Sequence, residues 1–291
     1  MSNFESYLIN RLHSMKINHS TYYTYICVLM LVLACPIMAH AVLPGEVRWH
    51  NEAADTTRIT EILIDASRLT PVTDGELVTS IAKRFIGTTY TAGTLEGSPE
   101  QLTVNLDGLD CTTFVETVLA MTLTVKERRS AWQDFVYNLG QIRYRQGRID
   151  GYSSRLHYIS DWIVDNTHRG NIKEMTGRMP NVAYAVKTLD YMTAHRDEYP
   201  ALKDSAEYER MKNCEIGYRS HRFPYIRSSV LMGKWSKENL KDGDILAFTT
   251  KVPGLDVSHM GIVVMQNDGP HLLHASTRAG KVTLEDRTLG E

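Results

Sequence analysis

One cysteine is placed where its thiol could act as a nucleophile. Cys111 follows Asp110 in "DGLDCTTFVETVLAM" (107–121), at the point where a polar turn becomes an apolar run. Aspartate is a preferred N-cap, so the cysteine is predicted to be the first residue of a helix. There the helix dipole favours the thiolate, and free backbone N–H groups can hold a developing oxyanion. The alternative is a packing role, because free cysteine is among the most buried residue types.

Two histidines supply a base and a group to orient that base. His259 lies in "SHMGIVV" and His274 in "LLHAS". If these segments are neighbouring antiparallel strands, the turn near Gln266–Pro270 brings the two imidazoles side by side. His259 can then take the thiol proton, while His274 fixes the tautomer of His259 through its far ring nitrogen. The chain order cysteine, histidine, histidine therefore predicts a thiol hydrolase.

The elements that must position these residues change character along the chain. Apolar residues recur at helical spacing in the first two thirds, over 55–69, 74–87, 111–125, 131–145, 156–167 and 181–195. Short strand-like segments separated by turn residues follow, over 243–251, 258–266, 271–277 and 281–287. Helices first and an antiparallel meander last predict an α+β fold in one domain, 42–291.

The first 41 residues have the features of an export signal. Basic residues precede the apolar stretch "YICVLMLVLACPIMAHA" (25–41), which ends in a small-x-small pattern at Ala39–Ala41. Its apolar core of about a dozen residues is too short to span a bilayer comfortably. We therefore expect a signal peptide over 1–41, a mature protein in the periplasm or cell envelope, and no membrane span after cleavage. The alternative is a lipoprotein attached through Cys35.

Charge and cysteine content narrow the possible partners. The formal net charge is −2, so no nucleic-acid partner is expected. The local cluster Arg143, Arg145 and Arg148 is interpreted as a solvated helix face. The mature chain retains two cysteines, Cys111 and Cys214. They could pair, but a disulfide would consume the thiol that the proposed chemistry needs.

Several short motifs together resemble the NlpC-type superfamily of cell-wall cysteine amidases and peptidases. The motifs are "YTAG" (90–93), "LDCTTFVE", "GDILAF", "SHMGIVV" and "LLHAS". The resemblance implies a papain-like α+β fold, in which N-terminal helices, including the nucleophile helix, pack on a C-terminal antiparallel sheet. It also implies that Cys111 is the nucleophile, His259 the general base and His274 the residue that orients it. Tyr90 matches a tyrosine that lines the cleft in that family.

The sequence also departs from that family. Thr112 and Thr113 replace the usual Ser-Gly pair, and a helical insertion of about 125–235 separates the cysteine from the histidines. The insertion, with "YSSRLHYISDW" (152–162), resembles a bacterial branch described as N-acetylmuramoyl-L-alanine amidase-like. The implied substrate is a muropeptide or peptidoglycan, cut between the lactyl group of muramic acid and L-alanine.

The insertion offers substrate-binding side chains of its own. Arg155 could pair with a substrate carboxylate, and Tyr158 or Trp162 could stack on a sugar face. His157 could bind substrate or cap a helix. The alternative is an amphipathic helix with Tyr158 and Trp162 in the core and Arg155 at its rim, and core packing is favoured for Trp162.

Other polar residues adjoin the predicted catalytic group. Asp110, Thr112 and Ser258 flank it and complete the predicted substrate site. Glu116 is expected to be a solvated or locally paired carboxylate, and Asp256 a turn residue.

Three rival functions remain open at this point. A stem-peptide endopeptidase, cutting a γ-D-glutamyl-diamino acid bond, would use the same three residues. A catalytically silent muropeptide-binding module would retain the fold without turnover. A zinc enzyme would use cysteine and histidine as ligands, but the sequence has no HExxH or CxxC spacing, so no metal or other cofactor is expected.

Overall fold

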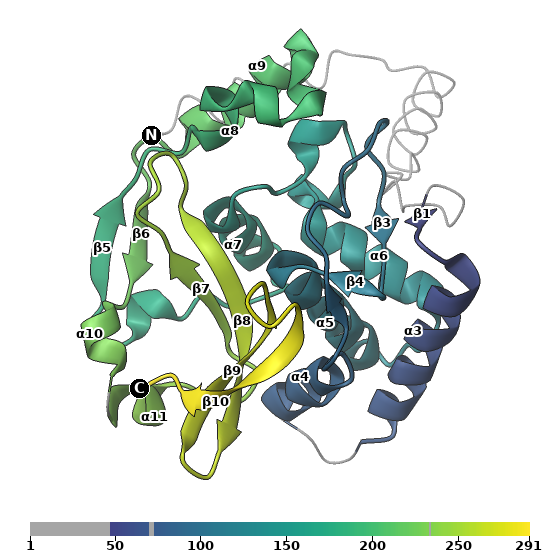
Figure 1. Ribbon diagram of the computed structural model, residues 1–291, viewed down its shortest axis with the longest axis vertical. Coiled ribbons are helices and arrows are strands. Elements are labelled where there is room, and N and C mark those ends of the chain that lie inside the picture. The colour runs from purple at the N-terminus through teal and green to yellow at the C-terminus, as the bar shows by residue number, and fades with distance from the viewer. Residues whose placement is uncertain (1–46, 70–72, 233) are drawn as a thin grey trace, which may run out of the picture. The chain divides into compact units, whose positions relative to one another are not determined.

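The computed structural model describes residues 47–69, 73–232 and 234–291 (Figure 1). These residues belong to one compact unit, 42–291. The predicted signal peptide, 1–41, lies outside the described residues. Within the described ranges, no helix is both long enough and apolar enough to cross a membrane.

A six-stranded sheet carries the C-terminal part of the chain, with the strand order β4-β2-β10-β9-β8-β7. Four of its strands form an antiparallel meander: β7 (Ile245–Thr249), β8 (Val257–Gln266), β9 (Gly269–Ser276) and β10 (Lys281–Thr288). These confirm the four predicted strands. Two very short strands, β2 (Thr89–Tyr90) and β4 (Gly108–Leu109), extend the sheet beyond β10. The sequence pattern missed them, since two residues show no alternation.

One face of this sheet packs against helix α5 (Cys111–Lys126), which lies beside β8 and β9 in Figure 1. Met260 and Ile262 of β8 join Leu273 and Ala275 of β9 in the main hydrophobic core. The helix is buried along most of its length, because further helices cover its other sides. The sheet and α5 therefore form the centre of the fold.

The helices predicted in the first part of the chain are present. They are α3 (Glu52–Ser67), α4 (Asp74–Lys83), α6 (Trp132–Arg143) and α7 (Ile159–His168). Local capping explains two of the starts. The Asn51 side chain accepts the N–H of Ala54 at α3, and Thr73 and Glu76 form a capping box at α4. A separate two-stranded parallel sheet of β1 (Arg48–Trp49) and β3 (Thr103–Val104) adjoins these helices.

The predicted helix at 181–195 is wrong. Its first half is β5 (Ala183–Val186), which pairs with β6 (Arg222–Tyr225), and only α8 (Tyr191–Ala194) is helical. The apolar residues at helical spacing belong to two different elements, so their periodicity was coincidental. The insertion is thus mixed rather than purely helical. It also contains α9 (Ser205–Gly217) and α10 (Ser228–Leu231), and α11 (Lys234–Asn239) follows it.

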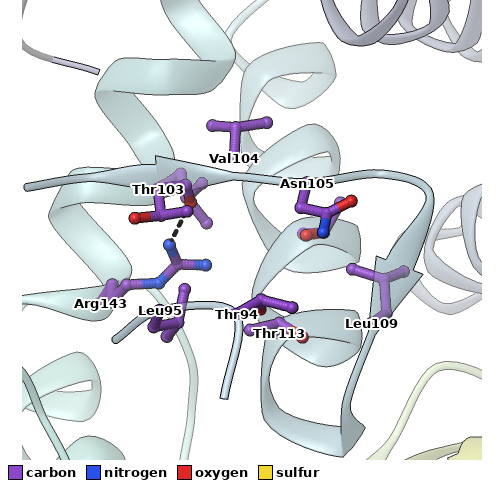
Figure 2. Close-up of a pocket in the computed structure, with 10 residues that line it drawn as sticks. Thr94, Leu95, Thr103, Val104, Asn105, Leu109, Thr113 and Arg143 are labelled. Carbon is purple, nitrogen blue, oxygen red and sulfur yellow. Dashed lines mark hydrogen bonds between the residues drawn. The ribbon is translucent and has the colours of Figure 1, made fainter. Parts of the chain in front are cut away.

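A buried ion pair joins α5 to α6. Arg143 Nε lies 2.6 Å from Glu116 Oε2, and both side chains are at most 3% exposed. Arg143 also donates to the carbonyl oxygen of Thr103 at 2.6 Å, across a small polar cavity (Figure 2). The prediction that Arg143 lies on a solvated helix face is therefore wrong. Glu116 was predicted to be either solvated or locally paired, and the structure shows that it is locally paired and buried.

Candidate active site

Cys111 occupies the first position of α5, as predicted from the residue before it. The Asp110 carboxylate accepts the N–H of Thr113 at 2.8 Å and the hydroxyl of Thr113 at 2.9 Å. The Asp110 N–H in turn donates to Thr113 Oγ1 at 2.9 Å, which closes a capping box. Thr113, one of the residues that departs from the family pattern, therefore helps to fix the start of the helix.

The Cys111 thiol is held between the helix start and strand β8. Its sulfur accepts a hydrogen bond from the backbone N–H of Met260, the residue after His259, and the Thr112 hydroxyl lies 4.0 Å away. Burial raises the pKa of Cys111, the Asp110 carboxylate raises it further, and the Met260 and Thr112 hydrogen bonds lower it only in part. The helix-dipole argument predicted a lowered pKa, but desolvation is larger. The resting thiol is protonated and needs a base.

The two histidines meet just beyond the paired part of the β8–β9 hairpin. Backbone pairing runs from Gln266–Gly269 to Ile262–Leu273. Beyond it, His259 Nε2 lies 2.5 Å from His274 Nδ1, with the two rings nearly perpendicular at 84°. The expectation that a hairpin brings the imidazoles side by side is confirmed.

A glycine makes this close contact possible. Continuing the hairpin register places Gly261 opposite His274, between the two histidines. A Cβ at Gly261 would lie 3.0 Å from His274 Cβ, 3.0 Å from the Leu273 carbonyl oxygen and 2.8 Å from Leu272 Cδ1. The absence of a side chain at Gly261 therefore lets His274 lean toward His259.

We predict that Gly261→Ala displaces His274 and lowers activity by about tenfold or more, because a methyl group must push apart packed atoms. Overpacking of this kind also costs about 1–3 kcal/mol of unfolding free energy. Steady-state kinetics and urea unfolding measure the two effects. Gly217→Ala is the matched control, since nothing lies within 4 Å of a Cβ at that position. Equal activity of the two variants would contradict the packing argument.

A carboxylate extends the histidine pair onto a third strand. Glu285 Oε1 of β10 lies 2.9 Å from His274 Nε2, and Arg278 in the β9–β10 turn lies 3.2 Å from Glu285 Oε2. Burial lowers the pKa of His259, His274 lowers it further, and Glu285 acts in the opposite direction. Sequence reasoning missed Glu285. The signal was available, because 281–287 was predicted to be the strand next to His274.

Tyr90 is brought beside the thiol by the short strands. Parallel pairing of β2 with β4 aligns Tyr90 with Leu109, two residues before Cys111. Burial raises the pKa of the Tyr90 hydroxyl, and the nearby Cys111 and Asp110 raise it further. Tyr90 therefore lies beside the predicted nucleophile.

The predicted substrate contacts of Arg155 require correction. Its guanidinium bonds the Leu95 carbonyl oxygen at 2.9 Å and Glu96 Oε1 at 2.6 Å, with Glu100 at 3.7 Å. The side chain is only 5% exposed and lies over the Tyr152 ring. Arg155 is not at the rim of an amphipathic helix either. It holds the loop that follows Tyr90 against the insertion.

Tyr158 also has a structural environment rather than an open one. Its hydroxyl donates to Glu215 at 2.7 Å, and the residue is buried in a second hydrophobic cluster. Trp162 is fully buried in the main core, which confirms the core packing that the sequence favoured for it. His157 contacts the Tyr152 carbonyl oxygen at 2.8 Å through Nε2, and burial holds its pKa well below the usual range.

Two residues next to the predicted catalytic group have different surroundings. Ser258 is exposed beside His259. Asp256 is more than a turn residue. It is buried, and its carboxylate accepts the N–H of Ser160 at 2.6 Å, in the first turn of α7. This contact ties the insertion to the start of the strand that carries His259.

Both cysteines of the described chain are free. Cys214 lies on α9, where its thiol contacts the Ser153 carbonyl oxygen at 3.9 Å. The alternative of a disulfide that consumes Cys111 is therefore wrong. Among the residues with described positions, no group of three or more His, Cys, Asp or Glu side chains is arranged to hold a metal ion.

Comparisons with known proteins place the chain in a family. A family model described as AmiA-like, N-acetylmuramoyl-L-alanine amidase-like, matches residues 80–291. A solved N-acetylmuramoyl-L-alanine amidase from Bacteroides uniformis is 39% identical, with a TM-score of 0.69, over 75% of this chain and 91% of that one. A Bacteroides fragilis protein, described as a candidate xylanase, is 41% identical with a TM-score of 0.66 over 72% and 91%.

A more distant structure, protein LPG0564 from Legionella pneumophila, shares the fold at 24% identity and a TM-score of 0.59, over 81% of this chain and 89% of that one. No curated protein sequence matched the chain. The matched region 80–291 contains the capped cysteine, both histidines and Glu285. The chain belongs to the AmiA-like family of N-acetylmuramoyl-L-alanine amidase-like proteins, which are cell-wall hydrolases.

Proposed function

We propose that this protein hydrolyses the amide bond between N-acetylmuramic acid and L-alanine in peptidoglycan fragments. Cys111 is the nucleophile, His259 the general base, and His274 orients His259. Two observations carry the proposal, and both lie inside the region matched by the amidase-like family. A capped helix-start thiol is bonded by the backbone of Met260, the residue after His259, and His259 is itself paired with His274.

The proposed reaction passes through an acyl-enzyme. The Cys111 sulfur attacks the lactyl carbonyl carbon while His259 takes the thiol proton. The resulting oxyanion faces the backbone N–H groups at the start of α5. His259 then gives its proton to the leaving amine of L-alanine, and a thioester remains. Water attacks the thioester after losing a proton to His259, which releases the lactyl carboxylate and restores the thiol.

We extend the proposal to architecture and location. A nucleophile helix packed on a C-terminal antiparallel sheet is the arrangement expected of the NlpC-type papain-like fold. The substrate lies outside the cytoplasm, in agreement with the export signal proposed for residues 1–41. Mass spectrometry of the protein recovered from a cell-envelope fraction, with a mature N-terminus near Val42, would test the location.

We predict a rise of kcat/KM with pH that is complete near neutrality. His259 must be neutral to accept the thiol proton, and its pKa lies below 6.5, the ordinary value for histidine. The activity is therefore lost as the pH falls through that lowered pKa. It persists through neutrality, because the pKa of Cys111 is raised above its ordinary 9.0. A pH-rate profile with its acidic midpoint above 6.5 would contradict this assignment.

The experiment that tests the function is mass spectrometry of products from defined muropeptides, with wild type and Cys111→Ala in parallel. A free amino sugar with an intact stem peptide supports the amidase. A shortened stem peptide identifies the endopeptidase with the same residues. Binding without turnover by wild type identifies the silent module. Xylan serves as a further substrate, since one relative is described as a candidate xylanase, and its cleavage would contradict the proposal.

A further inference from the structure

We propose that Glu285 is a positioning residue that acts through His274 to set the tautomers of both histidines. By doing so it leaves His259 Nδ1 as the free acceptor for the Cys111 proton. The inference rests on the proposed function, which assigns His259 as the base. It adds a fourth member to the catalytic group, on a strand that the three-residue mechanism does not use.

The geometry forms one continuous row across three neighbouring strands. His259 of β8 contacts His274 of β9 at 2.5 Å, and His274 contacts Glu285 of β10 at 2.9 Å. Each contact uses a different nitrogen of His274, Nδ1 toward His259 and Nε2 toward Glu285. Both nitrogens of His274 are therefore committed within the row.

The positions of the protons follow from the carboxylate at the end of the row. An ionised carboxylate only accepts hydrogen bonds, so His274 Nε2 must carry a proton. A neutral His274 is then unprotonated at Nδ1 and accepts from His259 Nε2–H. A neutral His259 protonated at Nε2 has its lone pair on Nδ1. That is the nitrogen needed to receive the thiol proton.

The fold holds Glu285 in place from both sides. The β9–β10 register shifts between Leu284 and Thr288, and such bulges re-aim side chains. The Glu285 carbonyl oxygen accepts from His271 Nδ1 at 2.9 Å, and His271 is itself buried. Arg278 bonds the outer carboxylate oxygen. The carboxylate is thus directed at His274 rather than free to rotate into solvent.

The same row stabilises the charge that forms during reaction. When His259 takes the thiol proton it becomes a cation, and the Glu285 charge opposes the loss of basicity caused by burial and by His274. The other titratable groups beside the row and the thiol are Asp110 at the start of α5, Tyr90 on β2, Arg278, and His271 of β9, whose ring contacts the Glu285 carbonyl oxygen. Of the side chains that shift His259, Glu285 alone raises its pKa.

The test compares Glu285→Gln with Asp286→Asn, which removes the same charge from an exposed neighbour on β10. For E285Q we expect kcat to fall by about tenfold or more, with KM little changed. The acidic limb of kcat/KM should move to lower pH, because the group that raises the pKa of His259 is gone. Glu285→Asp should recover part of both effects, and Asp286→Asn should match wild type.

Two readouts on the protein without substrate separate this inference from the proposed function. Alkylation of the Cys111 peptide by iodoacetamide at neutral pH should be about tenfold slower in E285Q than in wild type. Nitrogen-15 NMR should show both histidines of the row protonated at Nε2 in wild type and a mixture of tautomers in E285Q. These results stand even if wild type cleaves no muropeptide, an outcome that overturns only the proposed function.

The inference is overturned if E285Q keeps wild-type kcat, pH limb and alkylation rate in a folded protein. It is also overturned if kcat falls without any movement of the pH limb or change of tautomer, since that pattern indicates a structural role alone. Circular dichroism and thermal unfolding of each variant establish that the comparison is made between folded proteins.

Discussion

Replacing Cys111 by alanine is expected to lower amide hydrolysis by at least about 10⁴-fold, because removal of a catalytic nucleophile leaves only binding and oxyanion contributions. The fold should survive. Cys111 is half-buried at a helix start, and the Asp110–Thr113 capping box does not involve its side chain. Product formation from a defined muropeptide and thermal unfolding of both proteins measure the two halves of the prediction.

Cys214→Ala is the control for this experiment. It removes the other free thiol of the described chain, on α9, and should leave kcat unchanged. Undiminished turnover by Cys111→Ala would contradict the thiol mechanism. It would also contradict the assignment of His259 as the base that activates the thiol. Loss of activity in Cys214→Ala alone would point to a different nucleophile.

Replacing Glu116 by leucine is expected to destabilise the protein by about 3–5 kcal/mol, since it strands a buried guanidinium without a counter-charge. Arg143 is only 3% exposed on its side chain and cannot lose its proton to escape the cost. Its remaining hydrogen-bond partner, the Thr103 carbonyl oxygen, carries no charge, and the Glu100 carboxyl acts on it only through a coulombic interaction. Urea unfolding of wild type and variant gives the difference in free energy.

The double variant Glu116→Leu, Arg143→Met tests the cause of that loss. Replacing both charges by apolar side chains of similar volume removes the uncompensated charge, so most of the stability should return, to within about 1–2 kcal/mol of wild type. A double variant as unstable as Glu116→Leu would mean that packing, rather than charge, accounts for the effect.

The parts of the site that were predictable depend on neighbours close in the sequence. Asp110 identifies the start of α5 because capping involves residues only three positions apart. His259 and His274 were predicted to meet because a short hairpin turn has few possible registers. The four strands of the meander were equally visible, since alternation over several residues is a local property.

The remaining parts of the site depend on where distant segments of the chain pack. Tyr90 reaches the thiol through pairing of two-residue strands, which leave no pattern in the sequence. Arg155 turns inward because Glu96 and Glu100, far from it in the chain, lie within reach of its guanidinium. The prediction of a helix at 181–195 is wrong for a related reason, because strand pairing with β6 overrides the local periodicity.

Sequence alone was enough to propose a nucleophile, a base and a residue that orients the base, together with the elements that carry them. The protonation states of these residues depend on the tertiary structure. Whether Cys111 rests as a thiol depends on burial between α5 and β8, and desolvation there outweighs the dipole of its own helix. The bulged strand that presents Glu285 to His274 is likewise a product of packing. Candidate catalytic residues can be proposed from local spacing, whereas their charge states follow from long-range contacts and solvent exclusion.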